Sequence, residues 1–478
     1  MQLLRRCLVL LLSCSCAFSI AADEPPSDST MRKWQREDAK VYREKFLAVD
    51  RSFSTEARAE AEARLSRIEN SSQPLSPIEF SVELCRITAL ADNGHTQCLP
   101  HGVGRIVCTR YADLVDENSP WCNLQEPDFE VPAFGRVPIS FRPFGEDFHV
   151  VRVRAEHADL LGAKLLAVDD KPIETLRVPL RTFAGGTPAY RDLAAADVLA
   201  SPQQLHAVKL SNRDDSVEYS FTLRNGKTMK RRFSLGPAND TDEWKTIPTT
   251  DQTPWSLQEP EKAFRHRDAP QIDSLVVQLR QILDSEDQPI AAFLADMEQK
   301  REALGRKNVV LDMRANGGGN LLVARDFMIE WPNRVPGRFY VLTSRKTFSA
   351  AIASIAYLKQ AGGDRVVIVG EPIGDRLMFF SDGLPVQLPH SGLFFLPAVI
   401  RMDYANGCRE YTDCFEGIVE AGKPAAKSLL VLPPELKRLP IAVGSLAPDV
   451  HAPWTIDSWI HGTDPAMEAV RDMEEARR

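Results

Sequence analysis

Apolar and polar positions follow two different periods along the chain, and the change of period divides it into segments. Within residues 31–70, apolar side chains recur at about helical spacing among charges. Pro77 opens a second helix that is expected to run to Leu90, because proline suits the first helical turn. The sequence therefore predicts an N-terminal helical segment over residues 23–76 and, over residues 77–130, a helix followed by a loop that contains a histidine.

The pattern is strand-like from residue 131 to 240. Alternation is clear at 148–153, and an Asn-Gly pair at 225–226 predicts a tight hairpin between two strands. The strand and turn expected at 161–173 are similar to the edge of a PDZ domain that receives an extended peptide, and an ordinary hairpin explains the same pattern. Residues 241–269, rich in Asp, Thr and Pro, are predicted to form a linker.

The last part of the chain, residues 270–478, alternates short apolar runs with amphipathic stretches. Repeated strand–helix units of this kind predict an α/β domain with a mainly parallel sheet that helices cover. The expected strands lie at 273–279, 308–313, 338–342 and 365–369, and the expected helices at 290–304, 321–331 and 350–360.

The composition is that of a globular protein and argues against one class of partner. The chain has 478 residues, of which 44% are hydrophobic and 26% charged, so it can bury several cores. Its formal net charge is -8, and no basic cluster is interleaved with aromatic residues. Nucleic acid is therefore not expected as a partner.

Residues 1–22 have the pattern of an export signal. Two arginines are followed by a short apolar run and by small residues up to Ala21 and Ala22, where cleavage is expected. Cys14 and Cys16 leave a lipid anchor open as an alternative. No later apolar run approaches the ~20 residues of a membrane-spanning helix. The sequence thus predicts an exported protein of the bacterial periplasm or cell envelope, or a secreted one.

Six cysteines follow the signal, and an even number in an exported chain predicts disulfides. Pairing within each local group costs the least loop ordering. Their spacing includes no Cys-x-x-Cys pair, so neither a metal nor a cofactor is expected. The expected pairs are Cys408 with Cys414, and Cys85, Cys98, Cys108 and Cys122 among themselves.

Two predicted strand ends carry residues suited to acyl-transfer chemistry. Gly317, Gly318 and Gly319 follow the strand at 308–313, and bare glycine N–H groups can hold an oxyanion, although a tight turn or a phosphate cradle would use the same run. No Gly-Lys-Ser/Thr follows, which disfavours nucleotide binding. Ser349 stands between a strand and a helix, where it could be a nucleophile or a helix N-cap.

The order of these motifs resembles the tail-specific, or C-terminal-processing, protease family. The resemblance covers roughly residues 270–470, with looser support upstream. It implies a core of the ClpP/crotonase type, no cofactor, and a polypeptide substrate that the β-rich, PDZ-like module would gate or present. It rests on the segments 312–319, 347–351, 369–372, 388–392, 448–450 and 462–465.

By this resemblance Ser349 is the nucleophile, and the N–H groups of Ala350 and of the glycine run, including Gly317 and Gly318, are the oxyanion donors. Many members use a lysine base where this chain has Arg376, which stays protonated and cannot accept a proton. The branch similar to the tricorn core takes a histidine from a Gly-His-Thr loop, which implies that His95 is the base.

The carboxylate that would orient His95 is left open between Glu410 and Glu416. Two rival functions also stay open. A catalytically inactive member that binds peptides or hydrophobic ligands is favoured by Arg376 and by Ile352, where many members have glutamate. An acyl-CoA enzyme of the crotonase type shares the glycine oxyanion run, but the export signal argues against it. The cleavage preference and the oligomeric state do not follow from the sequence.

Overall fold

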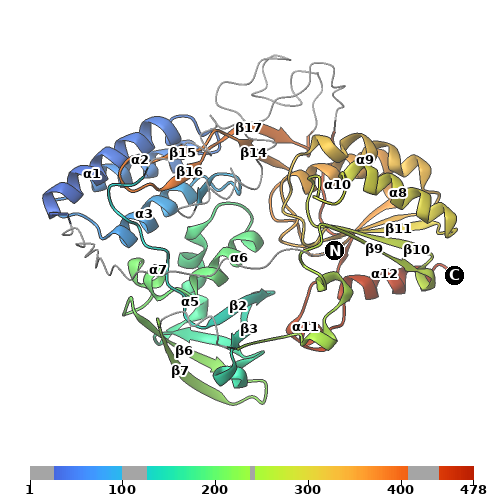
Figure 1. Ribbon diagram of the computed structural model, residues 1–478, viewed down its shortest axis with the longest axis horizontal. Coiled ribbons are helices and arrows are strands. Elements are labelled where there is room, and N and C mark those ends of the chain that lie inside the picture. Colours follow the sequence, from blue (N-terminus) through green and yellow to red (C-terminus); the bar gives the residue numbers. More distant parts are fainter. Residues whose placement is uncertain (1–25, 100–125, 237–242, 407–440) are drawn as a thin grey trace, which may run out of the picture.

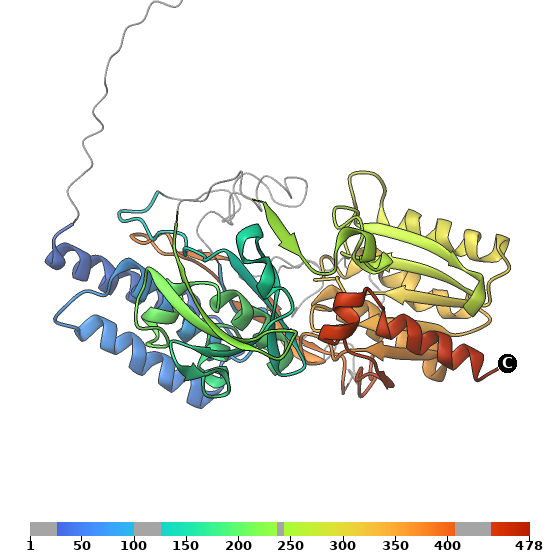
Figure 2. The same ribbon diagram turned by 90° about the horizontal axis from the view of Figure 1, so that it is seen from below.

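The computed structural model describes residues 26–99, 126–236, 243–406 and 441–478. Two lobes lie side by side (Figures 1 and 2). One contains the N-terminal helices and the β-rich module, and the other is the α/β domain. A two-stranded ribbon of β14 (Met378–Asp382) and β17 (Ala398–Asp403) reaches from the α/β domain to the N-terminal helices, where Ala398 O accepts a hydrogen bond from the N–H of Arg51.

Helices form the N-terminal segment, as the periodicity predicts. Their starts are set by serine N-caps, and at Ser76 the cap is a reciprocal capping box with Glu79. Aromatic and aliphatic side chains between the helices form a separate hydrophobic core. The elements are α1 (Asp28–Val41), the π-helical turn η1 (Tyr42–Leu47), α2 (Thr55–Asn70) and α3 (Pro77–Ala89).

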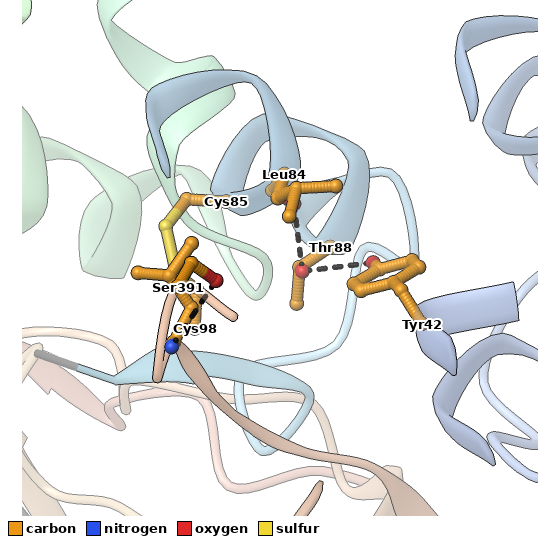
Figure 3. The surroundings of a disulfide bond; sticks show 7 residues. Tyr42, Leu84, Cys85, Thr88, Cys98 and Ser391 are labelled. Carbon is orange, nitrogen blue, oxygen red and sulfur yellow. Dashed lines mark hydrogen bonds between the residues drawn. A yellow bond between two sulfur atoms is a disulfide. The ribbon is translucent and has the colours of Figure 1, made fainter. Parts of the chain in front are cut away.

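A disulfide joins Cys85 of α3 to Cys98 of the short strand β1 (Gln97–Leu99) (Figure 3). This is one of the pairings expected within the first cysteine group. The other cysteines outside the signal, and the signal itself, lie outside the described residues. Nearby, the hydroxyl of Thr88 donates to Leu84 O and lies 2.9 Å from the Tyr42 hydroxyl, which fixes the end of α3 against η1.

The β-rich module contains a sheet in the order β2-β3-β4-β6-β7. The predicted hairpin is present, with Gly226 at φ 81° in its turn. Three helices that the pattern did not predict pack with this sheet. They span only 6 to 11 residues, which is too short for a helical period to stand out in the sequence. The strands are β2 (Ile139–Phe144), β3 (Asp147–Arg154), β4 (Lys164–Val168), β5 (Lys171–Pro172), β6 (Ser216–Thr222) and β7 (Thr228–Ser234), and the helices are α5 (Ile173–Leu180), α6 (Pro188–Val198) and α7 (Pro202–Ala207).

The stretch 241–269 is more ordered than the predicted linker. Strand β8 (Trp244–Thr246) pairs with β3, and β9 (Phe264–Ala269) pairs antiparallel with β10 (Ser274–Leu279) at the edge of the second sheet. Arginine side chains stack on the tryptophans of this stretch, with Arg152 4.2 Å from the ring centroid of Trp244. These strands were not predicted because the stretch is polar and its arginines and tryptophans do not form an alternating apolar pattern. Their side chains pack as cation–π pairs instead.

The α/β domain has the covered, mainly parallel sheet that the sequence predicts. Strands β10 to β13 and β18 are parallel, in the order β18-β13-β12-β11-β10-β9. Alternate residues of each strand pack on helices α8, α9 and α10 at one face and on α12 at the other. The remaining elements are β11 (Asn308–Asp312), β12 (Phe339–Thr343), β13 (Val366–Gly370), β15 (Val386–Gln387), β16 (Phe394–Leu396), β18 (Val450–His451), α8 (Ile290–Ala303), α9 (Leu322–Arg334), α10 (Ala350–Gly362), α11 (Ile456–His461) and α12 (Pro465–Glu475).

Two features of the described residues bear on partners. No helix of this part of the chain is both long and apolar enough to cross a bilayer. In the same residues, no group of three or more His, Cys, Asp or Glu side chains is arranged to hold a metal ion.

Candidate active site

Ser349 stands at the sharp turn from β12 into α10. Its backbone has φ 54° and ψ -127°, a region that a residue with a side chain rarely adopts. The hydroxyl makes no capping hydrogen bond to the helix, so the N-cap alternative does not describe this serine. A serine held in a strained turn with its hydroxyl uncommitted is typical of a nucleophile.

The glycine run lies directly against this turn. A Cβ added to Gly318 would come 2.5 Å from Ser349 Cβ and 3.0 Å from Ala350 N, and Gly318 has φ 106°. A Cβ on Gly319 would strike Ile282 O at 2.3 Å, whereas one on Gly317 would meet no atom within 4 Å. The close approach therefore requires glycine at 318 and 319, and the backbone of Gly317 borders open space.

Hydrogen bonds join the two strand ends. Thr347 Oγ1 donates to Met313 O at 2.9 Å, Ser344 Oγ donates to Arg314 O at 2.6 Å, and the Phe348 N–H donates to Asn316 O at 3.0 Å. The loops after β11 and β12 thus form one rigid unit. This unit holds Ser349 and the glycine run in a fixed relation.

The N–H groups predicted as oxyanion donors differ in their availability. Gly318 N–H donates to Asn316 Oδ1 at 2.9 Å, so it is already engaged. Ala350 is the first residue of α10, and within the described residues neither its N–H nor that of Gly317 has a hydrogen-bond partner. Ala350, with the positive end of the helix dipole behind it, is therefore the best-placed donor toward a developing negative charge beside Ser349.

A buried ion pair holds the start of the loop that carries the glycine run. Arg314 binds Asp464 at the start of α12 through both terminal nitrogens, at 2.7 and 2.9 Å, and also binds Asp312. Burial alone would raise the pKa of Asp464, but the Arg314 guanidinium outweighs it and holds this pKa below its ordinary value. The segment 462–465, quoted from the sequence as a motif, thus anchors the loop that follows β11.

His95 comes from the other lobe and lies beside the Ser349 turn. Its ring is stacked between Phe348, with 4.4 Å between centroids, and Phe379 of β14, with 4.7 Å. Tyr190 of α6 stacks on Phe348 at 4.9 Å, so four rings form a continuous stack. The structure therefore brings His95 next to Phe348, the residue that precedes Ser349, although His95 and Phe348 lie 253 positions apart in the chain.

No hydrogen bond links His95 to Ser349 among the described residues, because both ring nitrogens are buried without a partner. The ring is covered by Phe348 and Phe379, and its side chain is 11% exposed. A catalytic contact between Nε2 and the serine hydroxyl would require the His95 ring to change its position between Phe348 and Phe379. Such contacts are often slack before substrate binds.

Asp375 is the carboxylate beside His95, and the sequence analysis did not identify it. Its Oδ2 lies 3.3 Å from His95 Nδ1, a close approach that is not aligned as a hydrogen bond. The other oxygen accepts the N–H of Arg376 at 2.8 Å, which fixes the carboxylate, and the side chain is 1% exposed. Glu410 and Glu416, the two candidates from the sequence, lie outside the described residues.

Arg376, in the place of the family's lysine, points away from this chemistry. Its guanidinium binds Asp92 through the backbone oxygen and Oδ2, each at 2.7 Å. The pair is about half exposed. Arg376 thus supports the loop that carries His95.

A cavity of about 270 Å³ lies behind the His95 loop. Gly94 and Thr96, on either side of the histidine, are among its lining residues, together with Tyr190 and both cysteines of the disulfide. Neither Ser349 nor His95 lines it. The cavity therefore adjoins the back of the loop and lies outside the space in front of the serine.

Solved structures of mature CPAF are similar to this chain along nearly its whole length. The complex of mature CPAF with lactacystin has a TM-score of 0.56 at 11% identity, over 94% of this chain and 98% of that chain. Another structure of mature CPAF has a TM-score of 0.55 at 12% identity, over 93% and 97%. The photosystem II D1 C-terminal processing protease matches 92% of this chain and 98% of its own at 14% identity, with a TM-score of 0.35.

No protein-family profile and no curated protein sequence matches the chain. The resemblance to tail-specific proteases that the motifs indicated is confirmed at the level of the fold, through the match to CPAF. An identity of 11 to 12% carries no residue roles, so the roles have to be argued from the geometry of this chain.

Proposed function

We propose that this protein is an exported serine endopeptidase that hydrolyses peptide bonds through an acyl-enzyme on Ser349. The observation that carries the proposal is the Ser349 turn, where a strained serine adjoins the N–H of Ala350 and neither the hydroxyl nor this N–H has a hydrogen-bond partner among the described residues. The CPAF-like fold supports a peptidase.

In the proposed mechanism His95 is the general base, oriented by Asp375. The Ser349 proton passes to His95 as Oγ bonds to the peptide carbonyl carbon, and the Ala350 N–H holds the resulting oxyanion. The backbone around Gly317 and Gly318 forms the other wall of this site. His95 then protonates the departing amine as the C–N bond breaks, and water hydrolyses the acyl-enzyme by the reverse sequence of proton transfers.

A binding protein without catalytic activity is the second candidate. It is supported by the aromatic stack, which leaves both His95 nitrogens without hydrogen bonds, and by the apolar Ile352 one turn into α10. In that case the polypeptide or a hydrophobic ligand would be bound and released unchanged.

Labelling by a fluorophosphonate probe separates the two candidates, because the probe reacts only with an activated serine. The wild-type protein is expected to be labelled, and Ser349→Ala is expected to lose labelling entirely. Ser354→Ala is the matched control, since Ser354 is a buried serine of the same helix. Labelling that persists in Ser349→Ala would remove Ser349 from the mechanism, and an unlabelled wild type would favour the binding protein.

Export is part of the proposal and rests on the signal pattern at residues 1–22 together with the Cys85–Cys98 disulfide. Disulfides persist in oxidising compartments such as the periplasm. The polypeptide substrate would be met there, in the cell envelope or outside the cell.

A further inference from the structure

The loop that carries His95 is held from both sides by buried polar side chains. Asn93 pairs with Phe380 of β14, donating to its O at 3.0 Å and accepting its N–H at 3.1 Å. Thr96 Oγ1 donates to Asp50 Oδ2 at 2.9 Å. Asn93 and Thr96 are buried, so these bonds are shielded from water. Asn93 and Thr96 therefore fix the position of the His95 backbone between them.

Asp50 is an unusual partner for a threonine because it is a carboxylate removed from water. It is 2% exposed, and burial raises its pKa while hydrogen bonds from its neighbours oppose that rise. Oδ1 accepts the N–H and the hydroxyl of Ser52, at 2.8 and 2.5 Å. Oδ2 accepts Thr96 Oγ1 and the N–H of Ala398, the latter at 2.7 Å. Within the described residues no cationic side chain forms an ion pair with it.

Oδ2 joins the two structures that enclose the imidazole. Thr96 belongs to the His95 loop, and Ala398 begins β17, the strand paired with β14. Phe379 of β14 covers one face of the His95 ring. This carboxylate oxygen therefore joins the loop to the ribbon, together with the Asn93–Phe380 pair, on either side of the place where the ring lies.

We propose that Asp50 is a positioning residue for the general base, acting through Thr96. This inference rests on the proposed function, because it takes His95 as the base. It makes the N-terminal helical segment part of the catalytic apparatus, since Asp50 follows η1 and lies 45 positions before His95. Burying a carboxylate costs stability, and its hydrogen bonds to Thr96 and Ala398 place that cost where the His95 loop meets the strand paired with β14.

Four variants test this assignment. Thr96→Val keeps the shape and removes the hydroxyl, and Thr96→Ser restores the hydroxyl. Asp50→Asn keeps the shape but replaces one acceptor oxygen with a donor. Asp38→Asn is the matched control, because Asp38 is equally buried, also has a pKa raised by burial, and accepts the backbone N–H groups of His390 and Ser391 instead of bonds from the His95 loop.

The first measurement is the second-order rate of fluorophosphonate labelling of Ser349. Thr96→Val and Asp50→Asn are expected to lower it about 10- to 100-fold, because a base displaced by even 1 Å loses rates of this size. Thr96→Ser is expected to recover most of the rate that Thr96→Val loses. The double variant is expected to lose less than the two single losses combined, since both changes break the Thr96–Asp50 hydrogen bond. Asp38→Asn is expected to lower the melting temperature but leave the rate of the folded protein unchanged.

The second measurement does not depend on activity. The imidazole resonances of His95, assigned by their loss in His95→Gln, are expected to shift in Thr96→Val and Asp50→Asn and to stay in place in Asp38→Asn. Unchanged His95 resonances in both folded variants would overturn the positioning role, as would labelling at the wild-type rate. A wild type that is not labelled, with His95 resonances that still respond, would refute the peptidase proposal and the base role with it, and would show only that Asp50 positions the His95 ring.

Discussion

The two halves of the candidate site are built in different ways. Ser349, Ala350 and the glycine run lie at the ends of neighbouring parallel strands. Hydrogen bonds between the loops that follow these strands hold them in place. His95 lies in a loop of the other lobe and depends on distant residues, Asp50 in one direction and Asp375 in the other. Ser349, the proposed nucleophile, is therefore held at the edge of a sheet, whereas His95, the proposed base, is held by contacts within its own lobe and with the other lobe.

This difference has a functional consequence. A change in the N-terminal segment or in the β14–β17 ribbon can displace the base while the nucleophile and the oxyanion donors stay in place. Changes in the sheet should instead disturb the serine turn directly. The catalytic rate would then be controlled at the His95 side, because fewer local contacts hold that side in its position.

The largest effect is expected from Gly318→Ala, which breaks the nucleophile side. The new Cβ would meet Ser349 Cβ and Ala350 N in a backbone conformation that alanine adopts at a cost of about 1–3 kcal/mol. We expect the labelling rate of Ser349 to fall about 10³-fold, as when an oxyanion site is lost. Gly317→Ala is the matched control, because its Cβ would point into open space. Equal effects of the two changes would contradict the close packing described here.

Asp464→Asn tests the support beneath the same side. Asparagine can still cap α12, but it leaves the buried Arg314 without one of its two carboxylates, which we expect to lower the free energy of unfolding by about 3 kcal/mol. Urea unfolding at pH 7 measures this. Asp472→Asn, an exposed position of the same helix, should change it by less than about 0.5 kcal/mol.

The lowered pKa of Asp464 also determines how the free energy of unfolding changes with pH. Because the folded state disfavours the protonated acid, this pair stabilises the protein at neutral pH. The contribution is lost as the pH falls through the lowered pKa. The difference between wild type and Asp464→Asn should therefore shrink in strongly acid solution. A difference that grew on acidification would refute the ion-pair account.

Asp375→Asn tests the base side. An amide cannot stabilise the imidazolium that forms when His95 takes the proton, so we expect kcat to fall about 10²-fold, or about 2.7 kcal/mol, with little change in KM. Glu410→Gln and Glu416→Gln are the comparison, since the sequence named both as candidates for the same role. A loss in either that equals or exceeds the loss in Asp375→Asn would move the orienting role to that glutamate.

Local sequence patterns predicted the nucleophile side well. The four strands and three helices expected between residues 273 and 369 lie within three residues of the expected bounds, because buried parallel strands are uninterrupted apolar runs. The serine turn and the glycine run stand in those same local patterns. In the β-rich module the pattern predicted the hairpin and missed the short helices, which span 6 to 11 residues and show no clear helical period.

The base side was predicted only in part, for a physical reason. His95 was found through a motif, but Asp375, Asp50 and Phe379 acquire their roles from tertiary contacts that no spacing in the chain encodes. Asp375 directly precedes Arg376, and the resemblance marks that place only by the lysine that many members have there. A carboxylate followed by a chain reversal was the available signal, and it is too common to be specific.

The smallest effect is expected from Arg376→Gln. This variant tests whether Arg376 only supports the His95 loop or takes part in the chemistry itself. The Arg376–Asp92 pair is about half exposed, and Arg191 also binds Asp92, so the loop keeps one of its two cationic contacts. Exposed pairs contribute about 0–1 kcal/mol, so labelling should change by less than about threefold and the unfolding free energy by less than about 1 kcal/mol. Arg191→Gln should behave alike. A loss near 10²-fold in Arg376→Gln alone would mean that the residue in the lysine position has a direct part in the chemistry.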